Sequence, residues 1–306
     1  MKKKTLMRIL SAVCFVTGVV LATYLTINGS RQKQEYTLSQ ENGYFCLEAD
    51  KYIIKLLLDE WDKMDRHAMK YPEISDYLKF CYETIQFIEK KTGRYDWMDR
   101  LSNRAKDGKA ILLIVFENGI TSYTNPDEGS IYLDYYMMES GMSWIEHELT
   151  HMIMGECSEG TLSEGMASYI GEGLLGAEQS ITYGLDPDIF VQNEMLFEEH
   201  KERYAEVMEV VGNAKDPNIK RTEYGQTIYA AGHSYVKYLV NTYGMDKFNI
   251  IYDAGGSAEA YESITGNAMT EVKSDWLEYL KQFDGVMSAD EIYDYMLEHW
   301  NKYFGK

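Results

Sequence analysis

The sequence predicts an α+β fold in which a small mixed sheet packs on a central helix and a mainly helical lobe follows. Residues 110–116 form a compact apolar run, and residues 130–138 alternate in part and are rich in tyrosine, so both runs have strand character. The stretch 143–155 carries an apolar stripe at helical spacing. Beyond residue 176 the patterns are helical, and none is clearly that of a strand. Strands that precede most of the helices are typical of this class.

Length and charge limit the functions that the chain can have. Its 306 residues allow one large domain or two modest ones with a substantial core. Lys and Arg number 30 against 49 Asp and Glu, which gives a formal net charge of -19. Such a chain offers no basic face for a phosphate backbone, so we expect no nucleic-acid partner.

The first 30 residues have the pattern of a targeting segment. Four basic residues lie within the first eight positions, and residues 9–27 carry no charge, a run long enough to span a bilayer. We expect a signal-anchor with its N-terminus in the cytoplasm, so that the protein crosses the cell membrane once and the rest of the chain is extracytoplasmic. A cleaved signal peptide and a secreted product are the alternative.

The next segment is expected to be a helical N-terminal region. Residues 31–43 are polar and predict a short stalk. Between residues 44 and 107, apolar side chains recur at helical spacing in the stretches 47–61 and 78–88. The dipeptide Tyr71-Pro72 separates these two predicted helices.

Three cysteines lie beyond the targeting segment, which is an odd number for an exported domain. Cys46 and Cys81 could form a disulfide between the two N-terminal helices, and a pair of buried thiols is the alternative. Cys157 lies in a predicted loop directly after the helix at 143–155.

The two predicted strands differ in their surroundings. Residues 110–116 end at Asn118-Gly119 and predict a buried strand followed by a turn. Residues 130–138 lie just before the helix at 143–155, and as an exposed edge strand they could pair with an extended peptide. An ordinary edge strand, protected by its acidic residues Asp134 and Glu139, is the alternative.

The stretch 144–151, Trp-Ile-Glu-His-Glu-Leu-Thr-His, contains His-Glu-x-x-His. Two histidines four residues apart project from the same face of a helix, so His147 and His151 can bind one metal ion. Glu148 can then reach a metal-bound water as a general base. An incidental pair of surface histidines is the alternative.

The flanks of this motif support a helix. Ser143 and Glu146 form a possible capping box, with Ser140 as another possible N-cap. Gly155 is a suitable C-terminal stop.

Glu164 is the candidate third ligand. It lies in a predicted second helix, and the polar loop 155–160 allows a helical hairpin that brings Glu164 beside the two histidines. The alternative is that Thr161-x-x-Glu164 is itself a capping box and that Glu164 only caps its own helix.

Two stretches together resemble the gluzincin zinc metallopeptidases. They are His147-Glu-Leu-Thr-His151 and Ser163-Glu-Gly-Met-Ala-Ser-Tyr169, and the likeness is nearest to the aminopeptidase N-like branch and the broader peptidase MA-like group. The resemblance, over roughly residues 129–283, implies that Glu164 is the third zinc ligand. It also implies that one Zn²⁺ is bound per chain.

A third stretch, Tyr229-Ala-Ala-Gly232, opens an apolar helix running to Leu239 and resembles the Tyr-x-x-Gly of the same family. There the tyrosine hydroxyl supports the oxyanion of the tetrahedral intermediate, so the resemblance implies this role for Tyr229. His233, one helical turn further on, could share that role, and a solvated histidine or a histidine of the core is the alternative.

The chain departs from the aminopeptidases of this family in two ways. The loop between the second histidine and the glutamate is shorter, and no Gly-x-Met-Glu-Asn stretch, which would hold a free substrate amine, precedes the motif. We therefore expect an endopeptidase that hydrolyses peptide or protein substrates. An aminopeptidase, a zinc-binding pseudoenzyme that acts as a surface receptor, and a structural surface protein are the alternatives.

These observations divide the chain into three expected parts. Residues 1–30 form the signal-anchor, residues 31–107 the helical N-terminal region and residues 108–306 the zinc metallopeptidase domain. Within the last part, 108–155 holds the sheet and zinc helix, and 156–306 holds the helical lobe.

Helices are also expected later in the chain. One covers residues 190–211, one lies between Ser257 and Gly266, and the last runs to Tyr303 from a capping box of Ser288 with Glu291.

Overall fold

The computed structural model describes residues 35–176, 182, 184–196, 211 and 221–304. The predicted signal-anchor therefore lies outside the described residues. None of the helices described is both long enough and apolar enough to cross a membrane.

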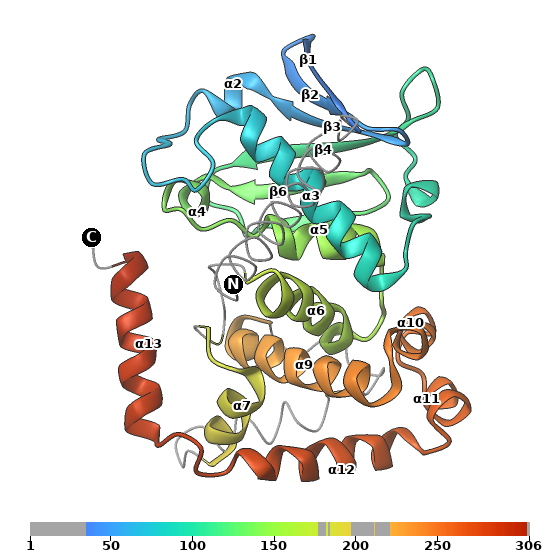
Figure 1. Ribbon diagram of the computed structural model, residues 1–306, viewed down its shortest axis with the longest axis vertical. Coiled ribbons are helices and arrows are strands. Elements are labelled where there is room, and N and C mark those ends of the chain that lie inside the picture. The colour runs from blue at the N-terminus through green and yellow to red at the C-terminus, as the bar shows by residue number, and fades with distance from the viewer. Residues whose placement is uncertain (1–34, 177–181, 183, 197–210, 212–220, 305–306) are drawn as a thin grey trace, which may run out of the picture.

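The protein has an α+β architecture with one mixed sheet (Figure 1). The spatial order of its six strands is β1 (Thr37–Glu41), β2 (Tyr44–Glu48), β3 (Tyr52–Leu57), β4 (Ala110–Glu117), β6 (Ser130–Asp134) and β5 (Tyr123–Asn125). The pairs β3/β4 and β4/β6 are parallel, and the other three are antiparallel. The predicted fold class is thus confirmed at the level of a small mixed sheet combined with helices.

The remaining regular elements of the described chain are helices. They are α2 (Leu58–Trp61), α3 (Ile74–Thr92), the 3₁₀ helix η1 (Trp97–Arg100), α4 (Tyr135–Glu139), α5 (Ile145–Met154), α6 (Gly160–Ser168), the π-helix η2 (Tyr169–Leu174), α7 (Pro187–Leu196), α9 (Arg221–Tyr243), α10 (Met245–Asp253), α11 (Ala258–Thr265), α12 (Met269–Leu280), the 3₁₀ helix η3 (Lys281–Phe283) and α13 (Ala289–Phe304).

The sheet half and the helical half meet at α5 and α6. Helices α3 and α5 pack side by side against the sheet, and α6 lies next to α5 and crosses α9 (Figure 1). Buried apolar side chains run without a break from the sheet through α5 to α9 and α12. The helix with the His-Glu-x-x-His motif is therefore in the centre of the core.

The expectation of a helical region at 31–107 is wrong for its first half. The polar stretch predicted as a stalk contains β1, and β2 and β3 occupy the first predicted helix. In β3 the side chains of Tyr52, Ile54 and Leu56 are buried and alternate with half-buried ones, which is the period of a strand. A short apolar run does not distinguish this period from that of a buried helix.

The turn at Asn42-Gly43 carries the signal that identifies these strands. Both residues have positive φ, 51° and 83°, and they join β1 to β2 as a two-residue hairpin loop. Asn-Gly between two strands is the preferred sequence for such a turn. Because β3 also pairs with β4, the expected domain boundary at residue 107 falls within one continuous sheet.

The second half of that region contains the predicted helix, and β4 occupies the predicted strand at 110–116. Helix α3 buries Leu78, Cys81 and Ile85 along one face, as predicted. Cys46 and Cys81 are both buried free thiols, which is the alternative to the disulfide considered for this pair.

The edge of the sheet beside α5 differs from the expectation. The predicted strand at 130–138 ends at Asp134, whose carboxylate accepts a hydrogen bond from the Met137 N–H and begins α4. β6 lies between β4 and β5, so the edge strand is β5, a segment that the sequence pattern did not reveal.

Several features of the helical half were predicted correctly. Ser257 caps α11 and Gly266 ends it, while Ser288 and Glu291 exchange the hydrogen bonds of a capping box before α13. Of the helix predicted at 190–211, the described part is α7, and residues 197–210 lie outside the description. No strand occurs after residue 176 in the described part of the chain.

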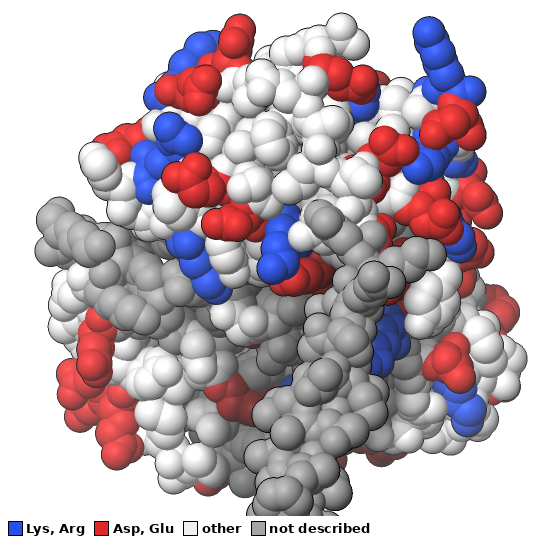
Figure 2. All heavy atoms as spheres, turned by 45° about the horizontal axis from the view of Figure 1, so that its top comes forward, with Lys and Arg blue, Asp and Glu red and all other residues white. Residues whose placement is uncertain are grey.

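The excess negative charge is dispersed on the face drawn in Figure 2. Asp and Glu side chains lie along the sheet half with Lys and Arg between them, and more Asp and Glu lie on the helical half.

Candidate metal centre

Helix α5 is fixed at both ends, although not by the predicted cap. The helix begins after Trp144, which supplies no side-chain cap, and Ser143 accepts its hydrogen bond from the Ile145 N–H at 3.2 Å. The expected capping box of Ser143 with Glu146 is therefore wrong, because the helix starts one residue later. The C-terminal stop at Gly155 is confirmed, with φ 78°.

Arg100 of η1 secures the far end of α5. Its guanidinium donates hydrogen bonds to the carbonyl oxygens of Met152, Ile153 and Met154 at 3.0, 2.6 and 3.0 Å. These carbonyls lack partners within the helix, and a cation is also favourable at the negative end of the helix dipole. Arg100 thus holds the helix that carries both histidines against the N-terminal half of the chain.

His147, His151 and Glu164 form a compact triangle of ligand atoms. The two Nε2 atoms are 3.1 Å apart, and each lies 3.2 Å from Oε2 of Glu164. Ligands of one tetrahedral zinc ion, each about 2.0–2.1 Å from the metal, lie about 3.3 Å from one another. The spacing of the three atoms therefore fits a single metal ion, and this group of three could hold one.

The position of Glu164 depends on a helical hairpin that the sequence predicted. Helix α6 follows α5 after a short loop, and its N-cap is Glu159, whose carboxylate accepts a hydrogen bond from the Leu162 N–H at 2.6 Å. The capping alternative for Glu164 is thus wrong, since Glu159 has that function. Glu164 faces the two histidines instead.

The electrostatics of Glu164 suit a metal ligand. Burial by itself raises the pKa of this carboxyl group, but the neighbouring imidazoles of His151 and His147 outweigh burial, and the pKa lies well below its usual range. The carboxylate therefore stays ionised inside the protein, which is the form that binds a cation.

A hydroxyl group supports one of the histidines from behind. Ser163 Oγ lies 3.4 Å from Nδ1 of His151, on the side of the ring away from the triangle. Partners of this kind fix the orientation and tautomer of a metal-binding imidazole. No local sequence pattern specifies this contact, because it depends on how α6 lies beside α5.

Glu148 lies beside the triangle and is held by the edge strand. Thr124 of β5 places its Oγ1 2.7 Å from Oε2 of Glu148 and 2.9 Å from the Glu148 carbonyl oxygen. Glu148 is buried, yet it borders both cavities of the site. It is not a member of the group of described residues that could hold the metal.

Tyr229 also lies beside the triangle, where the resemblance to the gluzincins leads us to expect it. Its ring centroid is 5.7 Å from that of His147, and it borders the same two cavities as Glu148. Helix α9 brings it there by crossing α6, where Gly232 contacts Gly165.

His233 occupies a different environment. It is buried, its imidazole lies against Tyr169 and Gly173, and it borders neither cavity of the site. Burial, with a contribution from Lys237, lowers its pKa to about 3. These features favour the alternative of a core histidine.

Two cavities meet above the triangle. The larger, of 1230 Å³, extends along β5 to Cys157 and Asp253, and the smaller, of 640 Å³, extends between Trp144 and Met137. Five residues border both: Thr121, Ser122, His147, Glu148 and Tyr229. Together the adjoining cavities form a cleft, in which the whole triangle borders the larger cavity and, of its three residues, only His147 borders the smaller one.

Cys157 borders the larger cavity but does not belong to the group of potential ligands. Burial raises the pKa of its thiol to about 12, so it is not a thiolate at neutral pH.

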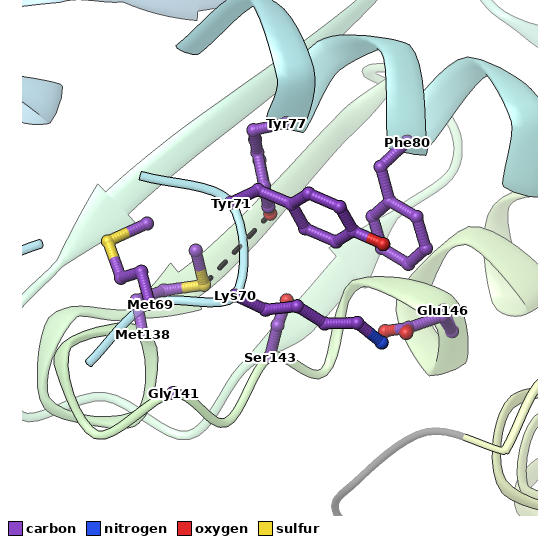
Figure 3. Close-up of a pocket in the computed structure, with 9 residues that line it drawn as sticks. All are labelled: Met69, Lys70, Tyr71, Tyr77, Phe80, Met138, Gly141, Ser143 and Glu146. Atoms are coloured by element: carbon purple, nitrogen blue, oxygen red, sulfur yellow. Dashed lines mark hydrogen bonds between the residues drawn. The ribbon is translucent and has the colours of Figure 1, made fainter. Parts of the chain in front are cut away.

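A third hollow lies behind α5 and has another character. Figure 3 shows Glu146 pointing toward Lys70, while Tyr71 stacks on Phe80 with ring centroids 4.5 Å apart. Its volume of 30 Å³ has room for little more than a water molecule. This hollow is a packing feature rather than a binding site.

No protein-family model matches the chain, and no curated protein matches it.

Proposed function

We propose that this protein is an extracytoplasmic zinc-dependent endopeptidase of the gluzincin type. The observation that carries the proposal is the triangle of His147, His151 and Glu164, with Glu148 beside it at the floor of an open cleft. An incidental pair of surface histidines does not account for a buried carboxylate placed 3.2 Å from both imidazoles.

The donor set favours zinc as the metal. Two imidazole nitrogens and one carboxylate oxygen are ligands that Zn²⁺ prefers, and three protein ligands leave a fourth position for water or substrate, as in catalytic zinc sites. When bound, zinc supplies Lewis-acid activation of water and of the scissile carbonyl. The role of the three side chains is to hold that ion at the floor of the cleft.

Glu148 and Tyr229 provide the remaining chemistry. Glu148 accepts a proton from the attacking water on its carboxylate and passes it to the nitrogen of the leaving amine. Tyr229 donates a hydrogen bond from its hydroxyl to the oxyanion that develops during the attack. Both side chains border the two cavities, as these roles require.

The shape of the cleft favours cleavage within a chain. The larger cavity is bordered by all three residues of the triangle, and the smaller one adjoins it at His147, Glu148 and Tyr229, so a bound peptide can extend from the scissile bond into both cavities. The edge strand β5 borders the larger cavity along residues 123 and 124 and offers backbone groups to an extended peptide.

One observation favours aminopeptidase activity as a second candidate. The larger cavity is bordered by the carboxylates of Glu156 and Asp253, and negative charge there would attract a free amino group. Asp253 is, however, paired with Arg94, which neutralises part of this charge.

The proposal is tested with internally quenched peptides that are blocked at the amino end, and with the same peptides carrying a free amine. The zinc-loaded protein should cleave the blocked peptides at internal bonds. Glu148→Gln should keep zinc and thermal stability but lose at least about a hundredfold in turnover, since general-base catalysis contributes about 10²–10⁴.

Cleavage confined to free-amine peptides would instead establish the aminopeptidase. No cleavage of either kind by zinc-loaded protein would favour a zinc-binding receptor. Undiminished cleavage by Glu148→Gln would place the chemistry elsewhere in the chain.

The location outside the cytoplasm rests on the sequence of residues 1–30. With an uncleaved signal-anchor, the full-length protein should fractionate with membranes and be degraded by protease added outside the cell. A mature N-terminus near residue 30, found in the medium, would indicate a cleaved signal peptide.

A further inference from the structure

One hydroxyl group joins the edge of the sheet to the centre of the site. Thr124 Oγ1 lies 2.7 Å from Oε2 of Glu148 and 2.9 Å from the carbonyl oxygen of the same residue. Both atoms are acceptors and both belong to Glu148. The single hydroxyl proton of Thr124 is therefore donated to this one residue of α5, whichever of the two oxygens accepts it. Among the described residues, Thr124 supplies a side-chain hydrogen bond to the Glu148 carboxylate, and Glu148 also borders the cleft.

The strand that carries Thr124 is itself fixed. Thr124 pairs with Ile131 of β6, and the stacked rings of Tyr123 and Tyr132, 4.5 Å apart, hold the neighbouring pair. The loop before β5 is tied to Asp134, whose Oδ2 accepts hydrogen bonds from two backbone N–H groups at 2.8 and 3.2 Å. The hydroxyl is therefore presented from a rigid element, although β5 is short.

We propose that Thr124 is a positioning residue for Glu148, and that it selects the orientation in which the carboxylate can accept the proton of the attacking water. This inference rests on the proposed function, because it gives Thr124 a role in the hydrolysis assigned to that site. The Thr124 hydroxyl acts only through Glu148 and does not touch the reacting atoms.

The physical reason is the freedom of a glutamate side chain. An unrestrained Glu148 would populate several rotamers, and only some place an oxygen within hydrogen-bond reach of a water at the triangle. A hydrogen bond to Oε2 and the packing of β5 on α5 restrict the carboxylate to one of them. Displacements of about 1 Å in an active site can lower turnover about a hundredfold.

The same strand that holds Glu148 is the one whose edge faces the larger cavity. A peptide that adds to β5 would therefore be aligned by the element that also aligns the base. Thr124 thus couples the position of a bound chain to the position of the group that acts on it.

The test compares Thr124→Val with Thr124→Ser in the zinc-loaded, full-length protein. Valine keeps the branched shape and removes the hydroxyl, so turnover should fall about tenfold to a hundredfold with little change in Michaelis constant. Serine retains the hydroxyl and should restore turnover to within about threefold of the wild type. Zinc content and melting temperature are measured for each variant.

A matched control is Thr84→Val on α3. Thr84 is buried, its Oγ1 has no hydrogen-bond partner among the described residues, and it lies outside the cleft. This substitution should leave zinc content, turnover and stability unchanged.

A double-mutant cycle separates positioning from packing. If Thr124 acts through Glu148, Thr124→Val should have no further effect on the residual activity of Glu148→Gln. An equal loss in both backgrounds, or wild-type turnover in Thr124→Val, would overturn the inference. So would a serine variant as impaired as the valine variant.

The inference and the proposed function fail in different ways. Undiminished hydrolysis by Glu148→Gln contradicts the proposed function itself. Loss of hydrolysis in Glu148→Gln, together with full activity in Thr124→Val, contradicts only the role of Thr124.

Discussion

Gly165 of α6 and Gly232 of α9 contact each other backbone to backbone where the two helices cross. A Cβ atom on Gly232 would lie 2.5 Å from the carbonyl oxygen of Thr161 and 3.0 Å from the Cα atom of Gly165. The first distance is shorter than real Cβ atoms show, and a Cβ atom on Gly165 would lie still closer to the Gly232 carbonyl oxygen, so both positions need glycine for the helices to approach. Gly165 follows the candidate ligand Glu164, and Gly232 is one helical turn from Tyr229. The crossing therefore sets the distance between the metal ligands and the tyrosine.

The first prediction concerns this crossing. Gly232→Ala should force α6 and α9 apart, lower the free energy of unfolding by about 1–3 kcal/mol and reduce hydrolysis, because overpacking shifts backbone that carries the site. Gly160→Ala is the control, since a Cβ atom there meets nothing within 4 Å. Urea unfolding and the peptide assay measure the two effects. Equal stability of both variants would contradict the account of the crossing.

The second prediction concerns the metal. The purified protein should contain about one zinc ion per chain, and Glu164→Gln should lose it, because the amide is a far weaker ligand than the carboxylate. Glu159→Gln, which changes the N-cap of the same helix, should keep zinc. Elemental analysis of both variants, with melting temperature before and after chelation, provides the measurement. Zinc retained with unchanged affinity in Glu164→Gln would remove Glu164 from the ligand set.

The third prediction concerns Tyr229. Tyr229→Phe removes one hydroxyl that acts when the oxyanion forms, so turnover should fall about a hundred- to a thousandfold. The Michaelis constant should change little, because the lost interaction is made mainly in the transition state. Tyr238→Phe, further along α9 and outside both cavities, should retain activity. A change in the Michaelis constant with turnover unchanged would assign Tyr229 to substrate binding instead.

The fourth prediction concerns the end of α5. Gly155 combines φ 78° with ψ -173°, a region that only glycine occupies readily, and a Cβ atom would collide with the Arg100 guanidinium. Gly155→Ala should therefore lower the free energy of unfolding by about 2–3 kcal/mol. Gly93→Ala separates the two causes, since Gly93 also has positive φ, 75°, but open space around it. For that control we expect the free energy of unfolding to fall by about 1 kcal/mol. Unfolding in urea measures the loss in both variants.

The fifth prediction concerns pH and the buried His233. Burial lowers the pKa of its imidazole to about 3, against an ordinary value of 6.5. Between these two values the unfolded chain binds a proton that the folded chain does not, so the free energy of unfolding falls as pH falls from 6.5 toward 3. His233→Gln lacks this contribution, so its stability should fall less steeply than that of the wild type.

Urea unfolding of both proteins at several pH values, in the presence of a chelator, measures the difference. The chelator removes the pH dependence of metal binding, and the contributions of all other groups cancel in the comparison. Parallel curves for the two proteins would show that His233 is not buried in its neutral form.

The sequence by itself determined the chemical core of the candidate site. The spacing of His147 and His151 is a property of one helix, and four residues place two side chains on one face wherever that helix lies. The short connection after the helix allows a hairpin that brings Glu164 beside the two histidines, and the resemblance to the gluzincins implies its role as third ligand. Local turn chemistry also predicted the stop at Gly155 and the capping box of Ser288 with Glu291.

The tertiary structure decided the features that depend on contacts between distant segments. The sequence pattern predicts a helix where the strands β2 and β3 lie, because a short apolar run fits both periods and only pairing with β4 makes β3 a strand. Pairing also made β5 the edge strand. The contact of Thr124 with Glu148 joins residues 24 positions apart, and no local pattern specifies it. A helix can thus be predicted from its own sequence. The groups that orient its side chains belong to other elements, which come together only when the sheet and the helices pack.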